Sequence, residues 1–135
     1  MNRLHFQPIQ GKSHDIIEAI LQTEEVASAG DAWTILSVVV EELVLNIVDY
    51  AGSDYLDVEI IRDEKSITLR FHDNGVPFNP LEKELPDITL PWEDRKIGGL
   101  GIFLVIKSMD DVAYEHTGKE NVLSVMKELP IRRLT

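Results

Sequence analysis

The chain of 135 residues contains no cysteine, which excludes disulfide bonds and thiolate metal sites. Metal-ligand spacing is also missing among its four histidines, which are His5, His14, His72 and His116. No apolar run approaches the roughly 20 residues that a membrane-spanning helix needs, and the N-terminal residues lack the apolar core of a signal peptide. We therefore expect a cytoplasmic protein that has no membrane segment.

Basic residues are scarce, since 13 lysines and arginines stand against 24 acidic residues and the formal net charge is −11. Such a surface repels a phosphate backbone, so direct binding of nucleic acid is disfavoured. The same charge would steer a basic protein partner toward the chain, although it is also what simple solubility requires.

Three common catalytic motifs are absent from the sequence. Gly11-Lys12-Ser13 resembles the end of a P-loop, but Phe6 occupies the position of the first glycine. Gly99-Leu100-Gly101 lacks the third glycine of a dinucleotide fingerprint, because Leu104 stands there. No Gly-x-Ser-x-Gly nucleophile elbow occurs. A nucleotide would have to be bound by other means.

The apolar spacing and the turn residues predict a single α+β domain over residues 1–135. Helices grouped together and strands in antiparallel pairs favour a two-layer sandwich, with helices on one face of a mixed, mostly antiparallel sheet. Residues 76–98 contain four prolines without a sustained period and are predicted to form a lid. The expected helices are 13–29, 32–51 and 100–109, and the expected strands are 4–8 (at an edge), 56–61, 66–71, 112–114 and 122–127.

The helix predicted at 32–51 is apolar nearly all round, yet Glu42, Asn46 and Asp49 recur at i, i+4 and i+7 along one stripe. A carboxylate buried on such a helix is normally paired, bound to a metal or directed into a cavity. The alternative is that the stripe faces water, and the helix alone leaves both readings open.

Two glycine-containing segments are further candidates for ligand binding. Asp73-Asn74-Gly75 follows a predicted strand, and its carboxylate could accept a hydrogen bond from the exocyclic amine of adenine, with the glycine beside the ring. The alternative is a simple turn, because this tripeptide is common in turns. Gly98-Gly99-Leu100-Gly101 leads into a helix, whose N-terminal N–H groups favour phosphate. A flexible turn remains the alternative for this second segment.

In their order along the chain, these segments resemble the GHKL ATPase superfamily, which includes DNA gyrase, histidine kinases and MutL. Residues 42–51 resemble its N box, and the two glycine segments resemble its two glycine boxes. The resemblance is closer to the single-domain anti-sigma-factor serine/threonine kinases. It rests on Asp73-Asn74-Gly75-Val76-Pro77-Phe78-Asn79-Pro80, on Gly98-Gly99-Leu100-Gly101-Ile102 and on the closing Gly118-Lys119-Glu120-Asn121-Val122-Leu123. It extends over essentially the whole chain and implies the Bergerat ATP-binding fold.

The resemblance implies a role for each matching residue. Asn46 would coordinate Mg²⁺ on the phosphates of ATP, and Glu42 would be the general base of phosphoryl transfer. Asp73 would bind the adenine amine with the help of a water, and Gly75 would lie beneath the ring. Asp49 departs from the family pattern, because an added acid on this stripe would repel the phosphates unless it meets metal or solvent. The remaining nucleotide-binding residues would be Gly99, Leu100 and Gly101, the two glycines acting through backbone N–H groups.

The resemblance also implies a regulatory function. A serine/threonine kinase of this type phosphorylates an anti-sigma-factor antagonist and holds a sigma factor in its other state, in a partner switch. The alternative is a nucleotide-dependent binding module that sequesters a partner without significant phosphotransfer. Glu42 favours the enzyme, because a structural nucleotide needs no base. A homodimer is also conceivable, with the edge strand near residues 4–8 as one candidate surface.

Overall fold

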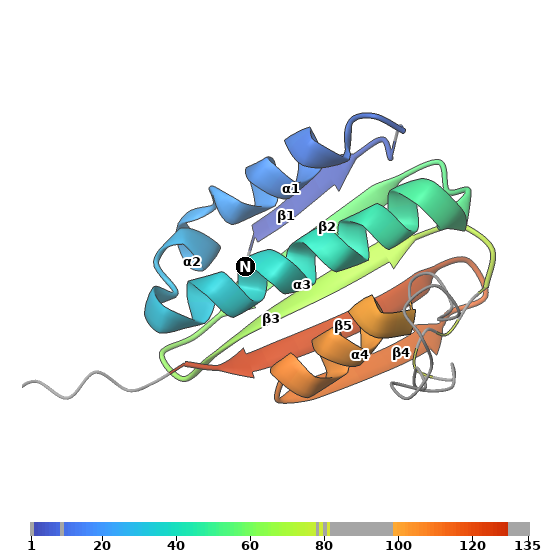
Figure 1. The fold of residues 1–135 in the computed structure, drawn as a ribbon. Coiled ribbons are helices and arrows are strands. Elements are labelled where there is room, and N and C mark those ends of the chain that lie inside the picture. The colour runs from blue at the N-terminus through green and yellow to red at the C-terminus, as the bar shows by residue number, and fades with distance from the viewer. Residues whose placement is uncertain (1, 9, 78, 80, 82–98, 130–135) are drawn as a thin grey trace, which may run out of the picture.

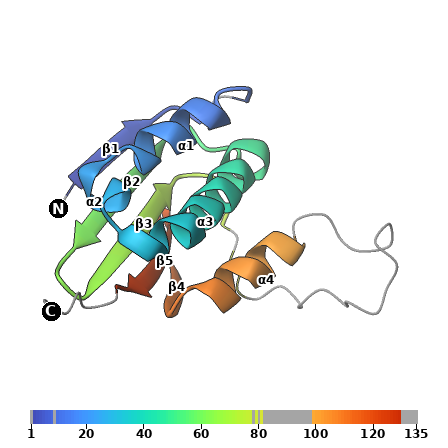
Figure 2. The ribbon, with the colours of Figure 1, turned by 60° about the vertical axis from the view of Figure 1, so that its left-hand side comes forward.

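One five-stranded sheet carries a layer of helices on a single face (Figures 1 and 2). The structure is a computed structural model that describes residues 2–8, 10–77, 79, 81 and 99–129. The strand order is β1-β2-β3-β5-β4, and all four described pairings are antiparallel. The α+β class and the two-layer arrangement are therefore confirmed, and the parallel pairing expected of a mixed sheet is not found among the described residues. The strands are β1 (Asn2–Phe6), β2 (Leu56–Arg62), β3 (Ser66–Asp73), β4 (Asp111–His116) and β5 (Asn121–Glu128).

The strand register brings distant polar residues into one row. Leu56 pairs with Asp73 across β2 and β3, and Asp73 pairs with Asn121 across β3 and β5. Side chains two residues apart on a strand share a face, so Asp73 lies on the same face as Phe71, which is fully buried. The end of β3 therefore directs a carboxylate toward the helical layer.

The helix predicted at 13–29 is wrong as a single element, because the chain forms α1 (Ser13–Leu21) and α2 (Glu24–Ala27) instead. Thr23 separates them in an extended conformation, with φ −61° and ψ 146°. Its hydroxyl donates a hydrogen bond of 2.7 Å to the carbonyl of Ile20. Threonine in this way offers the backbone an alternative to continuing the helix. A short 3₁₀ turn, η1 (Gly30–Ala32), then leads into the next helix.

The helix predicted at 32–51 is present as α3 (Trp33–Asn46), continued by the π-helical turn η2 (Ile47–Ala51). It ends at Gly52, whose φ of 63° is left-handed and suits glycine. Although this helix is apolar nearly all round in sequence, only part of it is buried. Leu36 and Val44 are fully buried, whereas Val38 is 48% exposed on the outer side.

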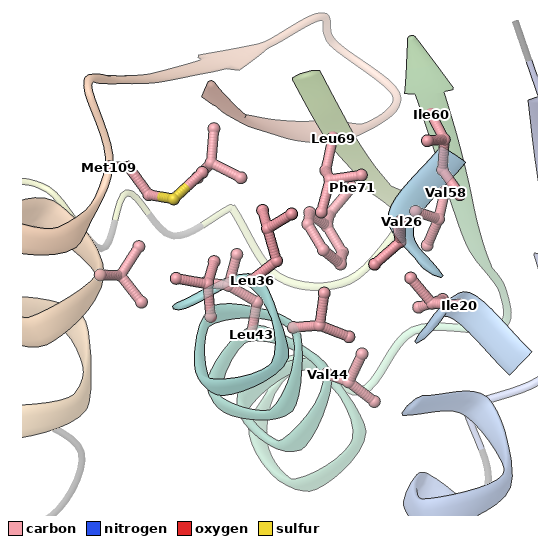
Figure 3. Packing of buried hydrophobic residues seen from close by; sticks show 14 of the residues in the cluster. Ile20, Val26, Leu36, Leu43, Val44, Val58, Ile60, Leu69, Phe71 and Met109 are labelled. Carbon is pink, nitrogen blue, oxygen red and sulfur yellow. The ribbon is translucent and has the colours of Figure 1, made fainter. Parts of the chain in front are cut away.

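The core lies between the helical layer and the sheet (Figure 3). Leu36 and Leu43 of α3 pack toward Leu69 and Phe71 of β3, and Ile20 of α1 closes one side. All five side chains are at most 2% exposed, and each contributes roughly 1.5–3 kcal/mol by leaving water. This packing fixes α3 over β3, and α4 (Gly99–Ser108) completes the helical layer beside α3.

Candidate functional site

Helix α3 presents Glu42 and Asn46 one turn apart, and both are half-buried. Glu41, their neighbour, is exposed. Burial raises the pKa of the Glu42 carboxyl above its ordinary value, and the negative charge of Glu41 raises it further. A carboxylate held in this way binds a proton more readily than one in water, which is what a general base requires.

Gly101, in the first turn of α4, lies directly against the Glu42 carboxylate. A Cβ atom built on Gly101 would stand 1.8 Å from Glu42 Oε1 and 2.0 Å from its Cδ. Only a residue without a side chain leaves the carboxylate where it is. The structure thus brings together two of the predicted segments, the N box and the second glycine segment. It places Gly99 and Leu100 in the same helical turn.

Asp73 stands at the end of β3 with only 5% of its surface exposed. Its Oδ1 accepts hydrogen bonds from the backbone N–H of Gly75 at 2.9 Å and from Asn121 Nδ2 at 3.2 Å. Burial raises the pKa of the Asp73 carboxyl, and these two hydrogen bonds oppose that rise. Among the described residues both bonds end on Oδ1, so Oδ2 is the oxygen available to a donor from a ligand.

Gly75 anchors the Asp73 segment on the end of helix η2. A Cβ atom on Gly75 would lie 2.2 Å from the carbonyl oxygen of Ala51, which is backbone and cannot swing away. The next residue, Val76, donates its N–H to that same oxygen at 3.1 Å. Asp73 is therefore held at a fixed position relative to the helix that carries Glu42 and Asn46.

Asn121 is a site residue for which the sequence suggested no role. It is 6% exposed, and its Nδ2 also donates to the carbonyls of Gly75 at 3.3 Å and Val76 at 3.1 Å. The hydroxyl of Tyr114 donates to its Oδ1. One side-chain amide thus fixes both the Asp73 carboxylate and the backbone that follows it. Asn121 entered the sequence analysis only as part of the closing segment 118–123, and its partner Asp73 lies 48 residues away in sequence.

The sequence model of the histidine kinase-like ATPase domain matches residues 12–127. The match spans most of the chain and includes each element that carries Glu42, Asn46, Asp73, Gly101 and Asn121. The chain belongs to this family. Comparison with curated proteins gives no match. Family membership places the chain among ATPase-type nucleotide-binding domains of the GHKL superfamily.

The donor set fits the magnesium–nucleotide complex of such a domain. Within the described ranges, no group of three or more His, Asp or Glu side chains could hold a metal by itself. Mg²⁺ usually keeps several waters and binds through one or two protein oxygens plus substrate phosphates. Asn46 offers one such oxygen on the helix face that also carries Glu42, so a metal here would depend on the nucleotide.

Asp49 lies in the π-helical turn and is exposed, in contrast to Glu42 and Asn46. A π turn contains more residues than an α turn, so it shifts Asp49 out of the i, i+4, i+7 phase expected from the sequence. Solvent can therefore screen the charge that would otherwise repel phosphate.

The predicted lid at 76–98 lies mostly outside the described residues, and so does its last residue, Gly98. The helices in the described part of the chain include none that is both long and apolar enough to cross a membrane.

Proposed function

We propose that the protein binds Mg-ATP and transfers its γ-phosphoryl group to a serine or threonine of a protein partner. The partner proposed is an anti-sigma-factor antagonist, in a switch whose other state holds a sigma factor. The observation that carries the kinase proposal is the contact between the Glu42 carboxylate and Gly101. In this contact a carboxyl group of raised pKa lies against the first turn of a helix, and the N-terminus of a helix favours phosphate oxygens.

In this reaction the hydroxyl oxygen of the acceptor forms a bond to the γ-phosphorus, and the bond from that phosphorus to the bridging oxygen of ADP breaks. Glu42 accepts the proton of the attacking hydroxyl. Bound Mg²⁺ would neutralise charge on the phosphates, with Asn46 as its protein ligand. Asp73 Oδ2 would accept a hydrogen bond from the adenine amine, and the N–H groups at residues 99–101 would orient the phosphates.

The experiment is transfer of label from γ-labelled ATP into the proteins of a host lysate, with wild type and Glu42→Gln compared in the presence of Mg²⁺. A small protein labelled on serine or threonine by wild type alone would support the proposal and identify the substrate. ATP binding should be nearly equal in the two forms, because glutamine keeps the shape of the side chain and removes only its basicity.

If wild type binds ATP but labels no protein, the kinase proposal is wrong and a nucleotide-dependent binding module takes its place. If Glu42→Gln loses ATP binding itself, the role given to Glu42 is wrong.

A further inference from the structure

The net negative charge of the chain arises in one part of the sequence. Residues 13–61 hold eleven of the 24 acidic residues and none of the 13 lysines and arginines. The rest of the chain therefore has 13 residues of each sign, and the net charge of −11 arises entirely within residues 13–61.

This acidic segment builds the helical layer from α1 through α3 (Figure 1). Asp15, Glu18, Glu24, Asp31 and Glu41 are all exposed along it. Within the described part of the chain, the helical acids form no ion pair with lysine or arginine, and the one ion pair they form joins Glu18 to a histidine. The two acids of the segment that lie on strand β2 are different, because both of them pair with Arg3.

An apolar groove opens in this acidic surface, between α1 and the first residue of α3. Its volume of about 270 Å³ lies below the 300–1,000 Å³ typical of small-molecule sites. Trp33 contributes to its wall and is 40% exposed, which is unusual for so large an apolar side chain. The lining residues are His14, Ile17, Glu18, Leu21, Gln22 and Trp33.

We infer that this groove is the docking site for a segment of a partner protein that inserts an apolar side chain and flanks it with lysine or arginine. Tryptophan walls are frequent centres of binding energy in protein interfaces. The excess of acidic residues on this helical layer attracts cations and, equally, repels the phosphates of nucleic acid and of anionic membranes.

The groove is separate from the nucleotide site. Trp33 and Glu42 are nine residues apart on one helix, which at 1.5 Å per residue is about 13 Å along the axis. The inference therefore does not depend on kinase activity, and changes in the groove should leave ATP affinity unaltered.

The probe is a 14-residue amphipathic peptide of leucine and lysine, titrated into the full chain and followed by amide chemical shifts and by affinity. Two control peptides accompany it, one with glutamate in place of lysine and one with serine in place of leucine. The variants are Trp33→Ala and Glu18→Lys. Their matched controls are Val38→Ala, an exposed apolar residue of α3 outside the groove, and Glu115→Lys on the edge strand β4.

We expect the leucine–lysine peptide to shift the amides of α1 and Trp33, and both control peptides to bind at least tenfold more weakly. Trp33→Ala should weaken binding about tenfold or more, and Glu18→Lys about threefold. The two control variants should bind as wild type does. Circular dichroism and an ATP titration verify that each variant is folded.

The inference is overturned if Trp33→Ala binds the peptide as tightly as wild type, because attraction would then be purely electrostatic. It is likewise overturned if the shifts lie outside α1 and the start of α3, or if the glutamate peptide binds equally well. Loss of ATP binding with normal peptide binding would count against the proposed function alone.

Discussion

Substitution of Gly101 by alanine tests whether the contact between α4 and Glu42 positions the proposed general base. The added methyl group would meet Glu42 Oε1 at 1.8 Å, whereas ordinary van der Waals contact begins at 3.4 Å. The carboxylate must therefore move by about 1.6 Å. It is the far end of a flexible side chain, so we expect it to swing aside without unfolding the helix.

The expected effect falls on phosphoryl transfer rather than on stability or on nucleotide affinity. Misplacing a catalytic group by about 1 Å costs on the order of 100-fold in rate, which corresponds to roughly 2.7 kcal/mol of barrier. Alanine is favoured over glycine in a helix by about 0.5–1 kcal/mol, which offsets part of any packing loss. We therefore expect the free energy of unfolding in urea to change by less than about 1 kcal/mol.

The assay measures label transfer from γ-labelled ATP at saturating nucleotide, beside ATP affinity and urea unfolding. Glu42→Asp combined with Gly101→Ala provides the control, because the shorter acid makes room for the methyl group. Adding Gly101→Ala to Glu42→Asp should therefore lower the rate of transfer by a smaller factor than adding Gly101→Ala to wild type. Full transfer by Gly101→Ala would refute the reasoning, since the base would then tolerate displacement.

Three further predictions concern the remaining site residues. Asn46→Ala should weaken Mg-ATP far more than Mg-free ATP in a calorimetric titration, and equal losses would exclude metal coordination by Asn46. Asn121→Ala should lower the free energy of unfolding by roughly 2–4 kcal/mol, because it removes a hydrogen bond to a carboxylate and two to carbonyls; a change below about 0.5 kcal/mol would contradict this. Burial raises the pKa of Glu42 above its ordinary value of 4.5, so folding disfavours its ionised form and wild type loses stability as the pH rises through the raised value. Glu42→Gln should therefore be the more stable form at pH 7 but lose that advantage below pH 4.5; an advantage independent of pH would show that charge is not its cause.

The fold could be predicted from sequence where local pattern decides the structure. The apolar helix that ends at Gly52 and the hairpin of β2 and β3 follow from periodicity and turn residues, and both are present. The break at Thr23 could not be predicted in the same way. Apolar residues stand on both sides of the break, and the hydrogen bond from the Thr23 hydroxyl to the Ile20 carbonyl lies at the interruption.

The residues of the candidate site could be selected from the sequence by type, but the contacts among them could not be predicted. Glu42 could be selected as a carboxylate in an apolar helix, Asp73 as an acid at the end of a predicted strand, and Gly101 as part of a glycine run that leads into a helix. The hydrogen bonds of Asn121 depend on the register of β3 with β5, which no local pattern determines. The π turn that displaces Asp49 was hidden for a similar reason, since it depends on how the end of the helix packs.

Helix α3 and its π-helical extension unite the two ends of the candidate site. Gly101 leaves no room for a Cβ atom against Glu42, and Gly75 leaves none against the carbonyl of Ala51, nine residues further on. Both glycine segments are thus positioned by the same helical segment. Gly101 lies at the proposed phosphate end, and Gly75 lies at the proposed adenine end. A nucleotide that contacts both segments would bind most tightly when this helix keeps its present course. Because α3 packs onto β3 through the buried core, folding of the chain sets the course of this helix and with it the relative positions of the two glycine segments.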